Sequence, residues 1–489
     1  MPLQHPDFSL PRAARRHLAP LALALAALLS GCASLTPQGS ALPPTPVPAE
    51  WSMPAPYPSS PSPAASLAAW WQGFNDPQLT ALVTQALQAN TDVRTAQAAL
   101  RQARALRDVK SAGLGPTLGT SASAQRSKSG GSEAGNSFQA GFDASWEPDV
   151  FGGKRSALNA TEADVQAAVA SLGNVQVSLA AEVAVTYIEL RGLQARLLIA
   201  RSNLAAQLET LQITRWRAQA GLASSLDVEQ GIAASEQTSA LIPSLETGVA
   251  QAASSLAVLT GQAPGALRGE LAAAAPVPQA ADALALAIPA ETLRQRPDVR
   301  AAEHRISAAL ARVAQAEAAR YPGFQISGSL GLRALTLGTL SSGASVANAL
   351  LASVSVPLFD GGAARAQVRT QEAGLEQARV SYQATVLTAL KDVEDALVSL
   401  RGNRERLARL QTAADAAANA DLLARQRYAS GLIDFRAVLE TQRTLLSTQD
   451  SVEATRASLS ADHVRLYKAL GGGWTPGLES LEPVATAAP

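Results

Sequence analysis

The chain has 489 residues, and its 40 lysines and arginines are balanced by 40 aspartates and glutamates. This balance provides no global field to attract nucleic acid or an anionic membrane surface, so we expect no nucleic-acid partner. With four histidines, one cysteine and no Ser/His/Asp or paired-carboxylate arrangement that stands out, the sequence predicts no metal site, no cofactor and no enzymatic activity.

The N-terminal region has the pattern of an export signal. A basic segment, Arg12–Arg16, precedes a 12-residue apolar run, Leu18–Leu29, which is too short to span a bilayer as a stable helix. The sequence Leu29-Ser-Gly-Cys32 follows and resembles the bacterial lipobox. We therefore expect residues 1–31 to be a lipoprotein signal peptide and Cys32 to become a lipidated N-terminus. The alternative is an ordinary secretory signal with an incidental thiol.

Residues 32–66 are predicted to be a tether. Ten prolines lie between residues 36 and 63, a composition that favours an extended chain without a core. Ala33 and Ser34, rather than an aspartate, follow Cys32, which by resemblance to lipoprotein sorting favours the outer membrane. The folded part is expected to begin near Leu67.

The segment that organises the rest is Lys154–Ala220, 67 residues without proline that end before a glycine. A continuous helix of this length would reach about 100 Å, and its leucines recur at an average spacing of about 3.5, as in a coiled coil. Upstream, apolar residues between Phe138 and Trp146 alternate strictly with polar ones, which predicts a two-faced strand. A return helix is expected over 226–259.

This plan occurs twice in the sequence. Asp92-Val-Arg94 recurs at Asp298-Val-Arg300, an offset of 206 (298 − 92), and Gly221-Leu222 recurs at Gly431-Leu432, an offset of 210 (431 − 221). We therefore predict a tandem duplication. The predicted parts are a first repeat over 67–262 with strands near 115–126 and 137–147, a connection over 263–290, a second repeat over 291–474 with strands near 323–333 and 349–358, and a tail over 475–489.

Four amphipathic strands of about ten residues do not form a stable sheet with both edges free, and very long helices cannot cover it. Strands of this length cross an outer membrane when tilted, with apolar residues facing lipid and polar residues facing a lumen. We therefore expect an α+β membrane protein in which several chains close a barrel. A soluble β-sandwich is the alternative, and it leaves the long helices unexplained.

At this point the chain resembles a known family, the TolC-like outer-membrane efflux proteins, and within it the lipoprotein branch that partners resistance-nodulation-division pumps. The matching segments are Leu29-Ser-Gly-Cys32, Trp70–Phe74 with Asp76-Pro77, Ser145-Trp-Glu147 with Phe151-Gly152, Arg217–Leu222 with Leu226-Asp-Val228, Arg296–Glu303, and Val356–Gly362.

The resemblance implies a homotrimer with a twelve-stranded β-barrel in outer-membrane lipid, continued by a long periplasmic α-helical barrel. The connection over 263–290 and the C-terminal segment would form an equatorial belt. Small molecules would pass from an inner-membrane pump, through a periplasmic adaptor, into this passive duct.

Two sets of site residues follow from the resemblance. The turns at Gly221, Leu222, Gly431 and Leu432 would contact the adaptor, although a glycine there also suits a simple helix C-cap. Nearby, Asp227 and Tyr428 match positions that hold the periplasmic entrance shut, and Glu440 stands where the family usually has an aspartate. In a trimer each would form a ring of three. The alternative is that they are solvated residues on exposed helix faces.

Two other functions remain open from the sequence. One is a type I protein-secretion duct of the same fold, which the lipobox and the Arg296-Pro-Asp sequence disfavour. The other is a lipid-anchored periplasmic coiled-coil scaffold without a pore. The substrate cannot be read from the chain, because selectivity would lie mostly in the pump.

Overall fold

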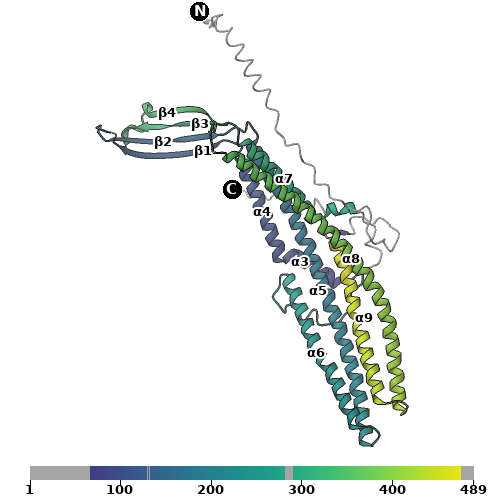
Figure 1. The fold of residues 1–489 in the computed structure, drawn as a ribbon. Helices are drawn as coiled ribbons and strands as arrows, with labels where there is room; N and C mark the ends of the chain where they lie inside the picture. The colour runs from purple at the N-terminus through teal and green to yellow at the C-terminus, as the bar shows by residue number, and fades with distance from the viewer. Residues whose placement is uncertain (1–66, 129, 132, 281–289, 475–489) are drawn as a thin grey trace, which may run out of the picture. The chain divides into compact units, whose positions relative to one another are not determined.

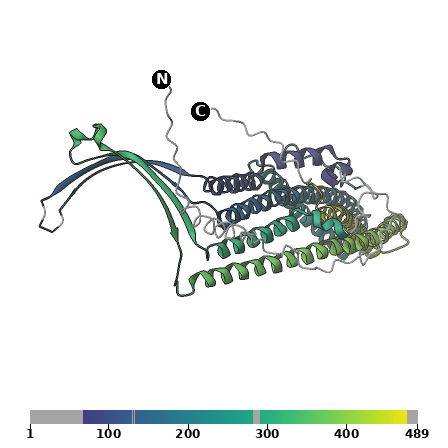
Figure 2. The same cartoon turned by 90° about the horizontal axis from the view of Figure 1, so that it is seen from above.

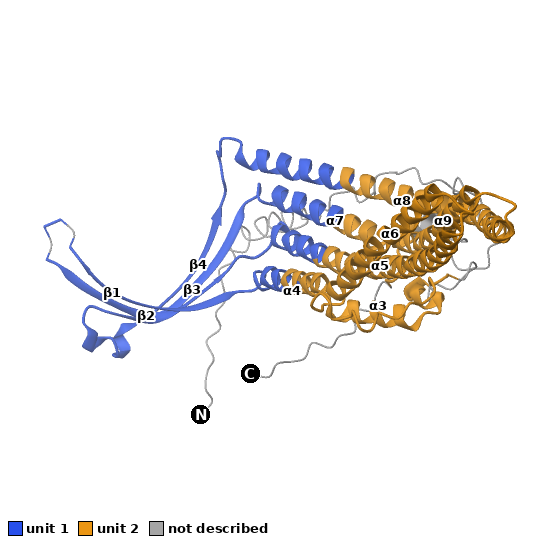
Figure 3. Ribbon diagram, turned by 90° about the horizontal axis from the view of Figure 1, so that it is seen from below, with its two compact units in different colours: residues 1–42, 104–164, 305–379 blue, residues 43–103, 165–304, 380–489 orange. Residues whose placement is uncertain are grey.

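A computed structural model describes residues 67–128, 130–131, 133–280 and 290–474. The predicted signal peptide, Cys32, the tether and the C-terminal tail lie outside the described residues. By internal contacts the described residues divide into two compact units (Figure 3). The first is formed by the described residues of 104–164 and 305–379, and the second by residues 67–103, 165–280, 290–304 and 380–474. These units do not coincide with the two sequence repeats, because each unit takes residues from both.

The first unit contains a four-stranded antiparallel sheet in the order β1-β2-β3-β4 (Figures 1 and 2). The strands are β1 (Thr117–Ser127), β2 (Gly135–Trp146), β3 (Gly323–Ala334) and β4 (Val346–Ser355). The junction between the repeats is therefore the β2–β3 pair, and the outer edges of β1 and β4 have no partner strand among the described residues.

The alternation in sequence gives the sheet two different faces. Phe142 pairs with both Thr120 and Leu330, and one position along, Asp143 pairs with Gly119 and Ser329. On the apolar face Phe142 is 58% exposed and Leu350 83% exposed. On the other face Asp143 accepts a hydrogen bond of 2.6 Å from the Ser121 hydroxyl. The chain thus presents an uncovered apolar surface on one side and a polar surface on the other.

The fourth strand differs from the prediction, which placed it near 349–358. It runs from Val346 to Ser355, because its register is set by pairing with β3 from Leu332↔Val346 to Gly323↔Ser355. Beyond Ser355 the partner strand ends, and Pro357 has no backbone N–H to donate to a ladder. The alternating apolar residues Val356 and Leu358, which extended the prediction, therefore lie outside the strand.

Two paired glycines bring β2 and β3 unusually close on the polar face. A Cβ atom at Gly141 would lie 2.7 Å from the Cα atom of Gly331. We expect Gly141→Ala to destabilise the sheet by about 1–3 kcal/mol, because backbone cannot move aside as a flexible side chain can. The measurement is the temperature at which the detergent-extracted protein loses its β-structure, followed by circular dichroism.

The matched control is Gly119→Ala, on the same face. There an added Cβ would meet only the Asp143 carbonyl oxygen at 3.9 Å, an ordinary contact. An equal loss of thermal stability in the two variants would contradict the close approach of β2 and β3.

The helices repeat with equal lengths in the two copies. The helices that precede the sheet, α4 (Thr91–Ala112) and α7 (Pro297–Ala318), have 22 residues each. The long helices α5 (Gly153–Gln219) and α8 (Ala363–Ala429) have 67 each, and the return helices α6 (Ser225–Leu259) and α9 (Phe435–Ala469) have 35 each. Helix α6, expected over 226–259, continues through Pro243. The predicted duplication is confirmed.

Each long helix begins at an aspartate in the preceding turn. Asp149 accepts hydrogen bonds from the backbone N–H groups of Lys154 (3.1 Å) and Arg155 (2.8 Å), and Asp360 accepts from those of Gly362 and Ala364 (both 2.8 Å). These donors, Ala364 first, hold the pKa of the Asp360 carboxyl below its usual value. A carboxylate at this end also complements the helix dipole.

Short helical elements complete the second unit. They are α3 (Pro77–Ala89), which is capped by Asp76, and two 3-10 helices, η1 (Trp70–Phe74) and η2 (Ala290–Gln295). Trp70 is fully buried and stacks on Tyr467 of α9 with ring centroids 5.4 Å apart. This stacking attaches the start of the described chain to the end of the last helix.

Candidate functional site

The two turns that join long and return helices share one geometry. Gly221 and Gly431 have φ values of 71° and 72°, the left-handed conformation that favours glycine at a helix C-terminus. In each turn the following leucine N–H bonds back to the carbonyl of an arginine five residues earlier, Arg217 (2.8 Å) or Arg427 (2.9 Å). The leucine side chains are then left outside, with Leu222 77% exposed and Leu432 74% exposed. Each tip therefore offers a rigid backbone turn with one projecting apolar side chain.

Helix α6 begins with a capping box in which Asp227 takes part. Its carboxylate accepts from the backbone N–H (2.9 Å) and the hydroxyl (2.8 Å) of Ser224, while the Asp227 N–H donates to the Ser224 hydroxyl oxygen. In α9 the corresponding cap is Asp434, which accepts from the Ala437 N–H at 3.0 Å. Asp227 therefore has a local structural role that the sequence analysis did not assign.

Tyr428 is buried at the α8–α9 tip and is held by residues from the first repeat. Its hydroxyl lies 3.3 Å from that of Thr214, and the Arg217 guanidinium lies 4.4 Å from its ring centroid. Arg217 also donates to the carbonyl oxygens of Tyr428 and Ala429, both at 2.8 Å. The Tyr428 carbonyl oxygen also accepts from the Gly431 N–H at 3.0 Å. The Arg217 cation therefore caps the C-terminal end of α8 and joins the two helical hairpins.

The three predicted gate residues, Asp227, Tyr428 and Glu440, lie in different surroundings. An apolar cluster of Ala234, Ala424, Phe435, Val438 and Leu439 surrounds Tyr428. Glu440 is exposed on α9, and no described hydrogen bond or ion pair joins Asp227 to Tyr428 or Glu440. Sequence reasoning missed Arg217, although its place in the last turn before Gly221, where a cation favours helix-end carbonyls, was a usable signal.

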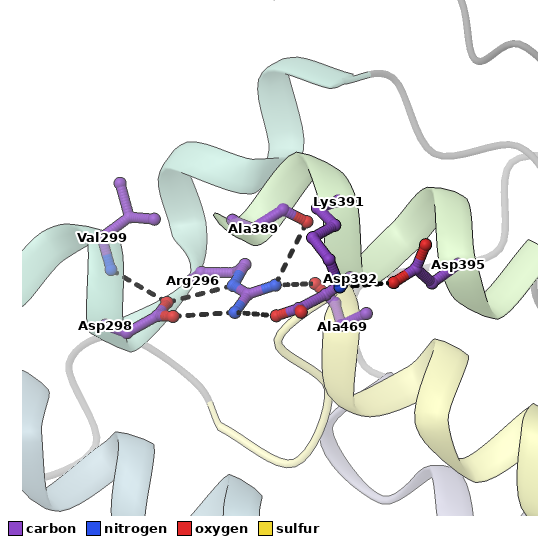
Figure 4. Close-up of polar contacts among 8 residues, drawn as sticks. All are labelled: Arg296, Asp298, Val299, Ala389, Lys391, Asp392, Asp395 and Ala469. Carbon is purple, nitrogen blue, oxygen red and sulfur yellow. Dashed lines mark hydrogen bonds and ion pairs between the residues drawn. The ribbon is translucent and has the colours of Figure 1, made fainter. Parts of the chain in front are cut away.

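A second polar arrangement fixes the other end of the return helices (Figure 4). Arg296 is buried and donates to Asp298 (2.7 and 3.0 Å), to Asp392 of α8 (3.2 Å) and to the carbonyl oxygen of Ala469, the last residue of α9 (2.8 Å). Burial alone would lower the pKa of Arg296, but the two carboxylates raise it above its ordinary value. One side chain thus joins α7, α8 and α9.

The first repeat makes the equivalent contact with an amide. Asn90 stands 206 positions before Arg296, is buried, and donates to the carbonyl oxygen of Leu259, the last residue of α6, at 2.9 Å. Its Oδ1 atom accepts from the Asp92 N–H at 2.7 Å and so caps α4 as well. The equivalent positions in the two repeats therefore both donate a hydrogen bond to the last carbonyl group of the return helix. The donor is a neutral amide in the first repeat and a charged guanidinium in the second.

Among the described residues, no group of three or more histidine, cysteine, aspartate or glutamate side chains could hold a metal ion. His463 does not belong to any such group. It is buried in α9, with its Nδ1 atom 2.9 Å from the Leu459 carbonyl oxygen.

Comparison with known proteins identifies the family. The family described as "Outer membrane efflux protein" matches residues 82–262 and 288–472, once in each repeat. The chain is 32% identical over 468 residues to the probable efflux pump outer membrane protein SepC of Pseudomonas putida, covering 93% of this chain and 96% of that protein. It is also 32% identical over 484 residues to the pyoverdine export outer membrane protein OpmQ of Pseudomonas aeruginosa, covering 93% and 98%.

The similar solved structures are also outer-membrane channels. The outer-membrane channel OprN superposes with a TM-score of 0.80 at 35% identity, over 90% of this chain and all of that one. The open state of the Neisseria gonorrhoeae MtrE outer membrane channel gives 0.81 at 27% identity, over 90% and 98%. The resemblance found in the sequence and the predicted fold class are confirmed. The chain belongs to the outer membrane efflux protein family, a family of outer-membrane channels rather than enzymes, and it serves as the outer-membrane duct of an efflux system.

Proposed function

We propose that three copies close into one barrel of twelve strands, four from each chain. The observation that carries this proposal is the four-stranded sheet with two unpaired edges and an exposed apolar face. Pairing β4 of one copy with β1 of the next would satisfy every edge, and lipid would cover the apolar face. The test is the mass of the detergent-extracted protein together with its conductance in planar bilayers. A monomer that conducts no ions would overturn the proposal.

The tips are proposed to meet a periplasmic adaptor that links the duct to a resistance-nodulation-division pump. Gly221, Leu222, Gly431 and Leu432 form two nearly identical rigid turns with exposed leucines, which suits docking of another helical end. The chain's relatives are named for toluene, pyoverdine and antibiotic efflux at almost equal identity. This supports a passive duct for small molecules whose substrate is chosen by the pump, and it favours efflux over protein secretion.

Asp227, Tyr428 and Glu440 are proposed to act in a periplasmic gate. In a trimer the two acidic residues would give rings of carboxylates near a narrow axis, which attract cations. We expect the double variant Asp227→Ala, Glu440→Ala to raise conductance in planar bilayers and to weaken block by divalent cations.

Because Asp227 also caps α6, a control must separate charge from helix capping. Ser224→Ala removes the capping partner and leaves the carboxylate in place. A conductance change in Ser224→Ala equal to that of the double variant would assign the effect to the cap instead.

We propose that Cys32 is lipidated and anchors the mature chain. Expression with radiolabelled palmitate should label the wild-type protein and leave Cys32→Ala unlabelled. Equal labelling of the two would contradict this site, which is the only cysteine of the chain.

A further inference from the structure

The polar face of the sheet carries a cation near the end that lies away from the helices. Side chains alternate between the two faces of a strand, so the polar-face residues of β3 are Gln325, Ser327, Ser329, Gly331 and Arg333. Arg333 is exposed and lies one residue before the end of β3, on the side that leads to β4. In an outer-membrane duct whose helices lie in the periplasm, this end of the sheet opens to the outside.

The neighbours of Arg333 on this face are shorter than arginine and uncharged. Arg333 pairs with Gln139 of β2, which pairs in turn with Ser123 of β1. The next row toward the helices consists of Ser121, Gly141, Gly331 and Ala347. An arginine side chain is longer than any of these, so the guanidinium of Arg333 can reach furthest into the space that the polar face borders.

The acidic residue of the polar face is too far along the strands to neutralise Arg333. Asp143 pairs with Ser329, which precedes Arg333 by four residues on β3, a separation of about 13 Å along the strand. At physiological salt, exposed charges further apart than about 8 Å are largely screened from each other. The four strands and the β1–β2 and β3–β4 connections contain three other charged residues, two cations and one anion: Arg126, Lys128 and Glu133.

We propose that three Arg333 side chains, one from each copy, form a cationic ring in the outer mouth of the duct and favour anionic over cationic solutes there. This inference rests on the proposed trimer, and it adds a preference among solutes to the passive duct. A ring of like charges in an aqueous pore attracts ions of opposite sign and repels ions of its own sign. The two ends of the duct therefore differ in charge, since the proposed periplasmic gate residues Asp227 and Glu440 are acidic.

Thiol modification in intact cells measures the charge beside Arg333 from the outside, without passage through the periplasmic gate. Gln139→Cys places a reporter thiol in the same row as Arg333. Its rate constants are measured with an anionic sulfonatoethyl and a cationic trimethylammonioethyl methanethiosulfonate. Adding Arg333→Gln should lower the ratio of the anionic to the cationic rate constant by roughly tenfold at low salt. This change should shrink at high salt, because the Debye length falls to about 3 Å at 1 M.

The matched control removes the same charge from the opposite face. Arg126 is two residues from Ala124 on β1 and belongs to the apolar face, near the same end of the sheet. Arg126→Gln should therefore leave the ratio of the reporter's rate constants unchanged. Arg333→Lys keeps the charge and should keep most of the ratio, which a purely structural role of the arginine would not predict. The wild type, with Cys32 alone, gives the background reaction.

The native mass of the extracted protein separates this inference from the proposed assembly. A trimer whose rate ratio is the same with and without Arg333→Gln would overturn the cationic ring and leave the assembly standing. A trimer in which Gln139→Cys reacts with neither reagent would also overturn the ring, because the polar face would then not line an open lumen. A monomer would overturn the assembly and the ring together.

Discussion

Replacing Arg296 with methionine is expected to destabilise the folded protein by about 2–3 kcal/mol. This is less than the roughly 3–5 kcal/mol for removing one partner of a fully buried ion pair, because the side chains of Asp298 and Asp392 are 26% and 40% exposed. The variant would leave Asp298, Asp392 and the Ala469 carbonyl oxygen without their shared donor. Thermal unfolding of the detergent-extracted protein, followed by far-ultraviolet circular dichroism, measures the effect. Arg296→Lys should lose much of the same stability, because an ammonium cannot reach all three acceptors with a planar fork.

The control lies in the same view (Figure 4). Lys391 forms an ion pair of 2.5 Å with Asp395 one turn away on α8, and both side chains are well exposed. Exposed pairs contribute little because water screens them, so Lys391→Met should unfold at the temperature of the wild type. If Arg296→Met also unfolds there, the polar anchor does not hold α7, α8 and α9 together.

Replacing Gly431 with tryptophan is expected to abolish drug export while the trimer still assembles. No atom lies within 4 Å of a Cβ atom built on Gly431, so a large side chain would project from the tip without disturbing the fold. Its cost is the left-handed backbone, about 1–2 kcal/mol for a residue with a Cβ atom. Export is measured as drug resistance of a host that carries the cognate adaptor and pump, and assembly as native mass.

Gly431→Ala separates bulk from backbone strain. Alanine carries the same conformational cost but adds only a methyl group, so its export should stay close to that of the wild type. A Gly431→Trp trimer of full length that exports normally would remove this tip from adaptor contact. Loss of export in both variants would point to the turn conformation rather than to the projecting surface.

The sequence predicted the helices well because their signals are local and repeated. The 67-residue proline-free stretch was expected from Lys154 to Ala220 and is found from Gly153 to Gln219. Its start is set by the Asp149 cap and its end by Gly221 in the left-handed conformation. Both residue types are local sequence signals for helix ends. The β4 strand was misplaced because alternation continues past Ser355, while the partner strand that defines the ladder stops at Gly323.

The candidate site was only partly predictable. The tip glycines and their leucines could be located by spacing, because each turn depends on residues next to one another. The contacts of Tyr428 could not be found in this way, since Thr214 and Arg217 lie more than 200 positions away. The cap formed by Asp227 was not predicted, although Ser224 followed by an acidic residue three positions later is a common helix-start motif.

The sequence by itself determined the duplication, the presence of four alternating strands and the positions of the long helices, because hydrophobic period, capping residues and proline placement act over a few neighbouring residues. Only the tertiary structure decided which arginine of each equivalent pair is engaged. Arg217 and Arg427 occupy the same place in the two repeats, yet among the described residues Arg217 donates to the carbonyl oxygens at the end of α8, whereas the Arg427 side chain is exposed. This difference depends on which surfaces the fold brings together. It cannot be predicted from two repeats that carry the same residue at the equivalent position.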